Sequence, residues 1–246
     1  MNTVLVTGGS RGIGRATSLL LARQGWQVAV NYRSRIDEAE SVVNAIEREG
    51  GSAFAVQADI ADEQQVMAMF AHIDAEQGYL AGLVNNAGIL FQQARVSQLS
   101  AERIQRVFAT NVLGSFLCCR EAVKRMAHPQ GRGGAIVNVS SAAARTGAPG
   151  EYVDYAASKA AMDALTTGLS LEVAAQGIRV NGVRPGFIYT DMHADGGEPG
   201  RVDRLAPLVP MQRGGQPAEI AETIAWLLSD AASYVTGAFI DAAGGR

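Results

Sequence analysis

Short apolar strands alternate with helical patterns along the whole chain, and this alternation constrains the fold more than any other feature. Seven segments have the apolar, β-branched character of strands, at residues 3–7, 27–31, 53–57, 80–84, 134–139, 178–184 and 238–241. Apolar residues at helical spacing lie between them and predict helices that include residues 13–21, 37–48, 101–126, 152–176 and 218–229. This alternation is typical of a parallel sheet covered on both faces, so we expect an α/β protein with a doubly wound sheet of about seven strands.

The chain shows no internal boundary. Its 246 residues contain no linker rich in Pro, Gly or Ser, no internal repeat and no low-complexity tract. A chain of this length buries a sizeable core without the help of disulfides or metals. We therefore expect one domain over residues 1–246. The segment ADIADEQQV, which follows the third strand, places Asp62 as the N-cap of a further helix.

Charge and hydropathy argue against two classes of partner. The net charge is −3, from 21 basic and 24 acidic residues, so a basic surface for nucleic acid is not expected. No apolar run approaches the roughly 20 residues that a membrane helix needs. The N-terminal MNTVLVTGG lacks the basic region of a signal peptide. We expect no nucleic acid and no membrane among the partners.

Cysteine and histidine usage indicates neither disulfides nor metal ligands. The two cysteines, Cys118 and Cys119, are adjacent, a spacing at which a disulfide is strained, and we interpret them as small packing residues. His72, His128 and His193 show no ligand spacing and are interpreted as surface or packing residues. We expect no metal site and a cytoplasmic location.

A glycine-rich loop, TGGSRGIG at residues 7–14, follows the first strand and opens the first helix. Gly8, Gly12 and Gly14 permit a tight turn and let backbone N–H groups approach a pyrophosphate, while the helix amino end adds partial positive charge. The spacing G-x-x-x-G-x-G differs from the commoner G-x-G-x-x-G, and a plain turn is the alternative. The position on the first βα turn favours a Rossmann-like sheet that binds a dinucleotide.

The segment NYRSR at residues 31–35, at the end of the second strand, indicates which dinucleotide binds. Sheets of this kind that bind NAD(H) usually carry an acidic residue here, which bonds the ribose hydroxyls. Tyr32, Arg33 and Ser34 stand in its place, with Arg35 close by and Arg11 in the glycine loop. Arginine suits bidentate contacts with phosphate, although solvated surface arginines are the alternative. The segment favours NADP(H) over NAD(H).

A tyrosine and a scarce lysine suggest the reaction. The chain has only two lysines, and Lys159 lies four residues after Tyr155 in YAASK. Residues at i and i+4 share a helix face, and an ammonium beside a phenol lowers the phenol pKa. Such a phenol exchanges a proton with an alcohol oxygen near neutral pH, although an ordinary surface pair has the same spacing. Ser140 and Ser141 end the fifth strand, where a hydroxyl can hold a substrate carbonyl oxygen.

Six motifs in order resemble the short-chain dehydrogenase/reductase family in its single-domain form. They are TGGSRGIG at 7–14, NNAG at 85–88, TNV at 110–112, NVSS at 138–141, YAASK at 155–159 and RPG at 184–186. The resemblance covers essentially the whole chain. It implies a single NAD(P)-binding, Rossmann-like oxidoreductase domain. Family members are usually tetramers or dimers, with the long helices after the fourth and fifth strands at the interfaces, and we expect a homotetramer.

The resemblance assigns a role to each matched residue. Tyr155 resembles the general acid/base, and Ser141 resembles the serine that orients the substrate. Lys159 resembles the lysine that lowers the tyrosine pKa and holds the nicotinamide ribose, and Asn111 resembles the anchor of a water-mediated proton relay. The remaining matches resemble cofactor contacts: Gly8, Ser10, Arg11, Gly12, Ile13, Gly14, Tyr32, Arg33, Ser34, Asp59, Ile60, Asn86, Ala87, Gly88, Pro185, Gly186, Ile188 and Thr190.

The chain departs from the family pattern in one spacing. Ser141 precedes Tyr155 by one residue more than is commonest, and we expect the extra residue in the loop at 147–152. Ser141 is still expected to be the substrate serine, ahead of Ser140. Tyr152 is no rival acid/base because the residue four positions later is Ala156.

The implied reaction is hydride transfer between NADP(H) and a small-molecule substrate, which interconverts a carbonyl and a secondary alcohol. The chain resembles the glucose-dehydrogenase-like and 3-oxoacyl-carrier-protein-reductase-like branches, so a sugar and a 3-oxoacyl thioester both remain open. The Tyr-x-x-Met-x-x-x-Lys arrangement of the family's enoyl reductases is absent. The alternative is a catalytically silent NADP(H)-binding sensor or structural subunit. Specificity is expected in residues 89–95, 147–154 and 192–209, the last resembling a mobile lid.

Overall fold

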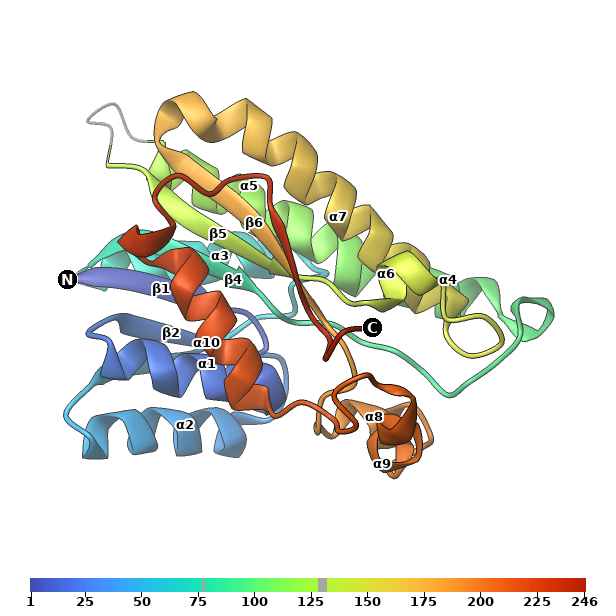
Figure 1. The fold of residues 1–246 in the computed structure, drawn as a ribbon. Coiled ribbons are helices and arrows are strands. Elements are labelled where there is room, and N and C mark those ends of the chain that lie inside the picture. Colours follow the sequence, from blue (N-terminus) through green and yellow to red (C-terminus); the bar gives the residue numbers. More distant parts are fainter. Residues whose placement is uncertain (77, 128–131) are drawn as a thin grey trace.

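Seven parallel strands form one sheet in the order β3-β2-β1-β4-β5-β6-β7 in the computed structural model, which describes residues 1–76, 78–127 and 132–246 (Figure 1). The strands are β1 Asn2–Val6, β2 Gln27–Tyr32, β3 Ser52–Gln57, β4 Tyr79–Asn85, β5 Gly134–Val139, β6 Ile178–Pro185 and β7 Phe239–Ala242. The sequence prediction of a doubly wound sheet with about seven strands is confirmed. The strand order reverses between β1 and β4, and ligands of open α/β sheets bind in the crevice at such a point.

Helices cover both faces of the sheet (Figure 1). One face carries α1 Gly12–Arg23, α2 Ile36–Arg48 and α10 Pro217–Leu228. The other carries α3 Glu63–Ala75, α5 Gly114–Met126 and α7 Val153–Val173. Shorter helices lie at the carboxyl edge of the strands or beside it: α4 Ala101–Phe108, α6 Ala143–Thr146, α8 Met192–Asp195 and α9 Arg201–Leu205. Among the described helices, none combines the length and the apolar character needed to cross a membrane.

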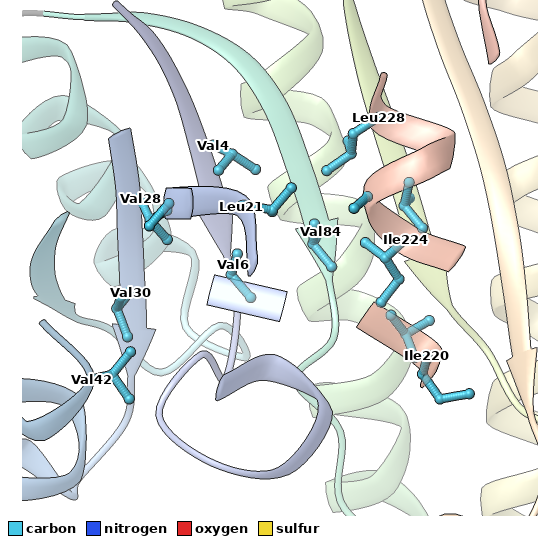
Figure 2. Close-up of a cluster of buried hydrophobic side chains, with 14 of the residues drawn as sticks. Val4, Val6, Leu21, Val28, Val30, Val42, Val84, Ile220, Ile224 and Leu228 are labelled. Atoms are coloured by element: carbon cyan, nitrogen blue, oxygen red, sulfur yellow. The ribbon is translucent and has the colours of Figure 1, made fainter. Parts of the chain in front are cut away.

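Each face of the sheet has its own hydrophobic core, because successive side chains of a strand point to opposite faces. On β1, Val4 and Val6 belong to the cluster under α1, α2 and α10, whereas Leu5 belongs to the cluster on the other face. Figure 2 shows the first cluster, in which strand valines meet Leu21, Val42, Ile220, Ile224 and Leu228. Burying each such side chain contributes about 1.5–3 kcal/mol. The two cores fix the face of every strand and therefore the direction of the loops at its end.

One helix expected from the sequence is interrupted. The segment expected as a single helix over 101–126 forms α4, a π-helical turn at Ala109–Leu113, and then α5. The side chain of Ser115, at the start of α5, donates to the backbone carbonyl of Asn111 in this turn at 2.9 Å. The helix expected at 152–176 is α7 followed by a 3₁₀ turn at Ala174–Gln176. The expectation of one uninterrupted helix is therefore wrong at both of these turns.

The structure also bears on the predictions for the helix cap, the cysteines and the potential metal ligands. Asp62 caps α3 and accepts from the backbone N–H groups of Gln64 and Gln65, as predicted. Cys118 and Cys119 are free and buried in the second core, and burial raises the pKa of both thiols. In residues 1–76, 78–127 and 132–246, no cluster of three potential metal ligands occurs. His128 lies outside the described residues.

Candidate cofactor cleft and active site

The glycine loop lies between β1 and α1 and adopts a backbone that side chains disfavour. Gly8 and Gly12 have φ of +60° and +53°, in the left-handed region that favours glycine. In the described structure Arg11 precedes α1 without a side-chain cap, so N–H groups of the first turn point outward unpaired. These groups and the positive end of the helix form a site suited to an anion such as a pyrophosphate.

Three side chains hold the glycine loop in place. Asn86 donates to the carbonyl oxygens of Thr7 and Gly8 at 2.9 and 3.1 Å, and Asn31 accepts from the backbone N–H of Gly8 at 3.2 Å. The hydroxyl of Thr7 accepts from the N–H groups of Asn86 and Ala87, at 3.0 Å each. A Cβ on Gly14 would overlap the carbonyl oxygen of Gly8 and lie 2.5 Å from Nδ2 of Asn86. Gly14 therefore permits close packing rather than direct access to a ligand.

A cleft runs from the glycine loop along the carboxyl ends of β1, β2 and β4. Most of the cofactor contacts expected from the sequence line it: Gly8, Ser10, Arg11, Gly12, Ile13, Tyr32, Arg33, Ser34, Asp59, Ile60, Asn86, Ala87, Gly88 and Thr190. The other four expected contacts, which are Gly14, Pro185, Gly186 and Ile188, do not line this cleft. Gly14 packs beneath the loop, whereas Gly186 packs against Ala243 and the buried Ile188 lines a second cavity behind the sheet edge. Pro185 ends β6 and is buried.

The cleft also contains residues that sequence reasoning missed. These are Asn31, Glu38, Ala58, Ile89, Thr110, Asp191 and Met192. Arg35, which the sequence offered together with Arg33 as a phosphate contact, also lines the cleft. Two of the arginines at this end are paired: Arg35 donates to Glu38 at 2.7 Å, and Arg11 donates to Asp195 of α8 at 2.9 Å. Only the fold brings α8 next to the glycine loop, so the sequence carries no local signal for the second pair.

Ser141 and Tyr155 face one another beyond the end of β5. Tyr155, in the first turn of α7, is 9% exposed, and burial raises its pKa to about 12 while a hydrogen bond with the Ser141 hydroxyl opposes this shift. The Ser141 hydroxyl also accepts from the backbone N–H of Ala143 at 3.1 Å. The neighbouring Ser140 points away and donates to the carbonyl of Lys159 at 3.2 Å. The structure thus brings Ser141, and not Ser140, to the tyrosine.

Lys159 is buried on the same helix face as Tyr155. Its ammonium donates to the carbonyl oxygen of Val139 at 2.7 Å and lies 5.7 Å from the centroid of the Tyr155 ring. Burial lowers the pKa of Lys159 to about 8, against the opposing charge of Asp163. The sequence led us to expect a lowered tyrosine pKa, and the structure differs because burial of the phenol outweighs any effect of this ammonium.

Asn111 lies in the π-helical turn and is fully buried. Its side-chain Oδ1 accepts from the N–H of Ile89 at 2.8 Å, and its Nδ2 donates to the carbonyl of Ile89 and the hydroxyl of Ser158, both at 3.0 Å. A Cβ on Gly88 would lie 3.5 Å from both Asn111 Oδ1 and Lys159 Nζ. The Asn111 amide and the Lys159 ammonium therefore both lie next to Gly88.

The loop at 147–154, which precedes Tyr155, and the segment at 192–209 are together called the substrate mouth, and side chains from distant segments hold them in place. Arg201 of α9 is buried and pairs with Glu151 at 2.9 Å and Glu198 at 3.3 Å. The hydroxyl of Tyr152 donates to the carbonyl of Gly196 at 3.1 Å. Arg103 of α4 pairs with the buried Asp154 at 2.7 Å. The segment at 192–209, expected as a lid, is thus built of two short helices and a 3₁₀ turn at Ala206–Leu208 tied to the loop at 147–154.

Comparisons with known proteins agree with this architecture. A family model described as "Enoyl-(Acyl carrier protein) reductase" matches residues 8–246. The chain is 69% identical over 247 residues to "Uncharacterized oxidoreductase YgfF" of Escherichia coli (strain K12), with all of both chains covered. It is 41% identical over 243 residues to "3-oxoacyl-[acyl-carrier-protein] reductase FabG" of Staphylococcus aureus (strain Mu50), covering 99% of this chain and 97% of the relative.

A solved structure provides the same conclusion in three dimensions. It is described as "a putative gluconate dehydrogenase from agrobacterium tumefaciens", with a TM-score of 0.92 and 34% sequence identity, and the match covers 99% of this chain and 95% of that one. The family resemblance inferred from the six motifs is therefore confirmed over nearly the whole chain. The protein is an oxidoreductase that belongs to the short-chain dehydrogenase/reductase family.

Proposed function

We propose that the protein interconverts a carbonyl compound and a secondary alcohol with NADP(H), and that Tyr155 is the general acid/base. The observation that carries this proposal is the meeting of Tyr155 with Ser141, next to Lys159. The Lys159 ammonium in turn lies beside Gly88, which lines the cleft that begins at the glycine loop. The loop fits a dinucleotide because its glycines and the uncapped amino end of α1 leave backbone donors accessible.

Each residue of the site has its own role in the proposed reaction. The cofactor, when bound, supplies or accepts a hydride. The hydroxyls of Ser141 and Tyr155 hold the carbonyl oxygen of the substrate, and Tyr155 gives it a proton in reduction or takes one in oxidation. Lys159 and Asn111 return the proton to Tyr155 through water. Because burial keeps Tyr155 protonated near neutral pH, the free enzyme is ready for the reductive direction.

NADP(H) is proposed over NAD(H) for two reasons. The end of β2 presents Tyr32, Arg33 and Ser34 to the cleft, without a carboxylate among them. In the described part of the chain Arg33 takes part in no ion pair, so its guanidinium is available to a phosphate.

Two substrate classes remain, and two relatives favour one each. FabG is named a 3-oxoacyl-carrier-protein reductase, and the structural relative is described as a gluconate dehydrogenase. Glu151, Glu198 and Arg201 form a charged network between the segments at 147–154 and 192–209, where specificity is expected, and this network favours a polar substrate. A 3-oxoacyl thioester and a sugar are therefore both proposed, and an assay must separate them.

The test is oxidation of NADPH and NADH, followed at 340 nm, against acetoacetyl thioesters, diketones, aldehydes and ketosteroids, with NADP-dependent glucose oxidation in parallel. Tyr155→Phe is expected to lose turnover by about 100-fold or more while it keeps NADPH affinity. Tyr234→Phe, on a fully exposed ring, is the matched control and keeps both. Turnover by Tyr155→Phe equal to that of the wild type would contradict the acid/base role. Tight NADPH binding with no turnover on any substrate would favour the sensor.

A homotetramer in the cytoplasm completes the proposal. Phe108, Leu113 and Phe116 are exposed along α4, the π-helical turn and α5, and Ala160 and Ala164 are exposed on α7, so both long helices offer surface for other subunits. Light scattering after size exclusion checks the assembly, and a monomer at micromolar concentration would contradict it. The two free, buried cysteines suit a reducing compartment.

A further inference from the structure

The cofactor cleft contains a carboxylate, Glu38, that the proposed function does not use. It is the third residue of α2 and lines the cleft together with Tyr32, Arg33 and Ser34. Its Oε1 accepts from Arg35 at 2.7 Å. Its Oε2 is shielded from solvent and has no hydrogen-bond partner among the described residues. An acceptor without a donor therefore lies at the end of the cleft where the second strand stops.

We propose that Glu38 sets the balance between NADP(H) and NAD(H): its carboxylate accepts from the ribose hydroxyls of NAD(H) and opposes the additional phosphate of NADP(H). The inference rests on the proposed function, since it assumes that this cleft holds a nicotinamide dinucleotide. It extends that function because it limits the preference for NADP(H) and predicts that the chain also binds NAD(H).

The charges around this end of the cleft support the proposal. Three arginines approach it, but Arg35 is neutralised by Glu38 and Arg11 by Asp195. Of the three, Arg33 is the guanidinium without an ion pair in the described part of the chain. A phosphate dianion that binds here meets one available guanidinium and the negative charge of Glu38. The covered Oε2 lacks a donor, and once the Glu38 side chain turns it toward the cleft it accepts from a ribose hydroxyl, as the carboxylate at the end of the second strand does in NAD(H) sites.

A purely local explanation of Glu38 leads to a different expectation. Acidic residues in the first turn of a helix are favoured by the helix dipole, and an i,i+3 pair with Arg35 adds a small stabilisation. Asp37 lies in the same turn and carries the same charge, but it does not line the cleft. If Glu38 acted only on α2, removing either charge would affect cofactor binding equally.

The experiment measures the dissociation constants of NADPH and NADH by fluorescence titration for the wild type, Glu38→Gln and Asp37→Asn at one ionic strength. Glu38→Gln is expected to tighten NADPH and to weaken NADH, each by roughly 3- to 10-fold, because one negative charge and one acceptor are lost. The tightening of NADPH is expected to shrink at high salt. Asp37→Asn is expected to leave the ratio of the two constants within about twofold.

A third variant gives a change of opposite sign. Arg35→Gln leaves the Glu38 carboxylate without its counter-charge and is expected to move the ratio toward NADH. An unchanged ratio in Glu38→Gln, or the same change in Asp37→Asn, would overturn the role of Glu38 while leaving NADP(H) binding intact. If the wild type bound neither dinucleotide, both the proposed function and this inference would fail.

Discussion

The cofactor cleft and the substrate mouth adjoin one another but are held together in different ways. The cleft is shaped by backbone, glycines and short amides, such as Asn86 and Asn31 on the loop that contains Gly8. The mouth is shaped by long charged side chains that join segments far apart in sequence, such as Arg201 and Glu151. A backbone cradle tolerates little change and binds one kind of group. A mouth of side chains can be altered residue by residue, so one fold can take many substrates.

The largest expected effect comes from filling the backbone cradle. In Gly14→Ala the new Cβ meets the backbone carbonyl of Gly8 and the side-chain amide of Asn86, which are hydrogen-bonded to one another. Overpacking of this kind costs about 1–3 kcal/mol of stability. The loop relieves this strain by shifting, and returning it to the wild-type geometry on binding costs up to the same free energy, so we expect NADPH affinity to fall by up to about 100-fold. Isothermal titration measures the affinity, and thermal unfolding measures the stability.

Gly168→Ala is the matched control for that change. Gly168 lies in α7, and a Cβ there meets no atom within 4 Å, so the variant should keep its affinity and gain about 0.5–1 kcal/mol of stability. Unchanged NADPH binding by Gly14→Ala would show that the cradle is not rigid and would remove the contrast with the mouth.

The second effect is a pH dependence that arises where the two regions meet. Burial lowers the pKa of Lys159 to about 8, and it raises that of Tyr155 to about 12. As the pH rises through 8, Lys159 loses its proton while Tyr155 keeps its own. Reductive turnover should therefore be steady below pH 7 and fall by roughly tenfold for each unit above 8. A profile measured from pH 6 to 10 tests this, and a level profile would exclude Lys159 as the titrating group.

The third effect concerns the mouth alone. Arg201→Ala leaves Glu151 and Glu198 without their shared partner. Loss of one partner of a buried pair costs about 3–5 kcal/mol, and we expect roughly 1–3 because both carboxylates are partly exposed. Hydrogen exchange should show a loosened segment at 192–209, and KM should rise while NADPH affinity stays. Arg204→Ala, on the exposed partner of Glu198, should change neither quantity measurably.

The smallest expected effect tests whether the two regions communicate. Asp195→Asn breaks the exposed pair that joins α8 to Arg11 of the glycine loop. Stability should change by less than about 1 kcal/mol, but NADPH should bind about two- to threefold more tightly because Arg11 is released to a phosphate. Asp203→Asn, in α9, serves as the control because Asp203 accepts only from Tyr189 in the described structure. Equal affinities in both variants would mean that the regions act independently.

The same contrast explains what the sequence could predict. Strand and helix positions follow from local periodicity, and the glycine loop and the Tyr155–Lys159 spacing are contiguous, so the fold and the centre of the site were predictable. Glu38 lies in α2, and the hydrophobic pattern of this helix identifies the residues of its buried face but not those that line the cleft. The pairs Arg201–Glu151 and Arg11–Asp195 join residues 50 and 184 positions apart. Contacts of this range depend on the completed fold, and a single sequence contains no local signal for them.

The π-helical turn at Ala109–Leu113 has a consequence for the inheritance of this fold. A wider turn carries one more residue than an α-turn, and each residue rotates a helix by about 100°. The turn therefore acts as a phase shift between α4 and α5. Deleting one residue there would restore a continuous α-helix, but it would turn either Asn111 or the apolar stripe of α5 away from its partners. Homologues that keep the length of this turn keep both Asn111 and the apolar stripe of α5 facing their partners. Point substitutions elsewhere on the helix do not change the rotation between α4 and α5.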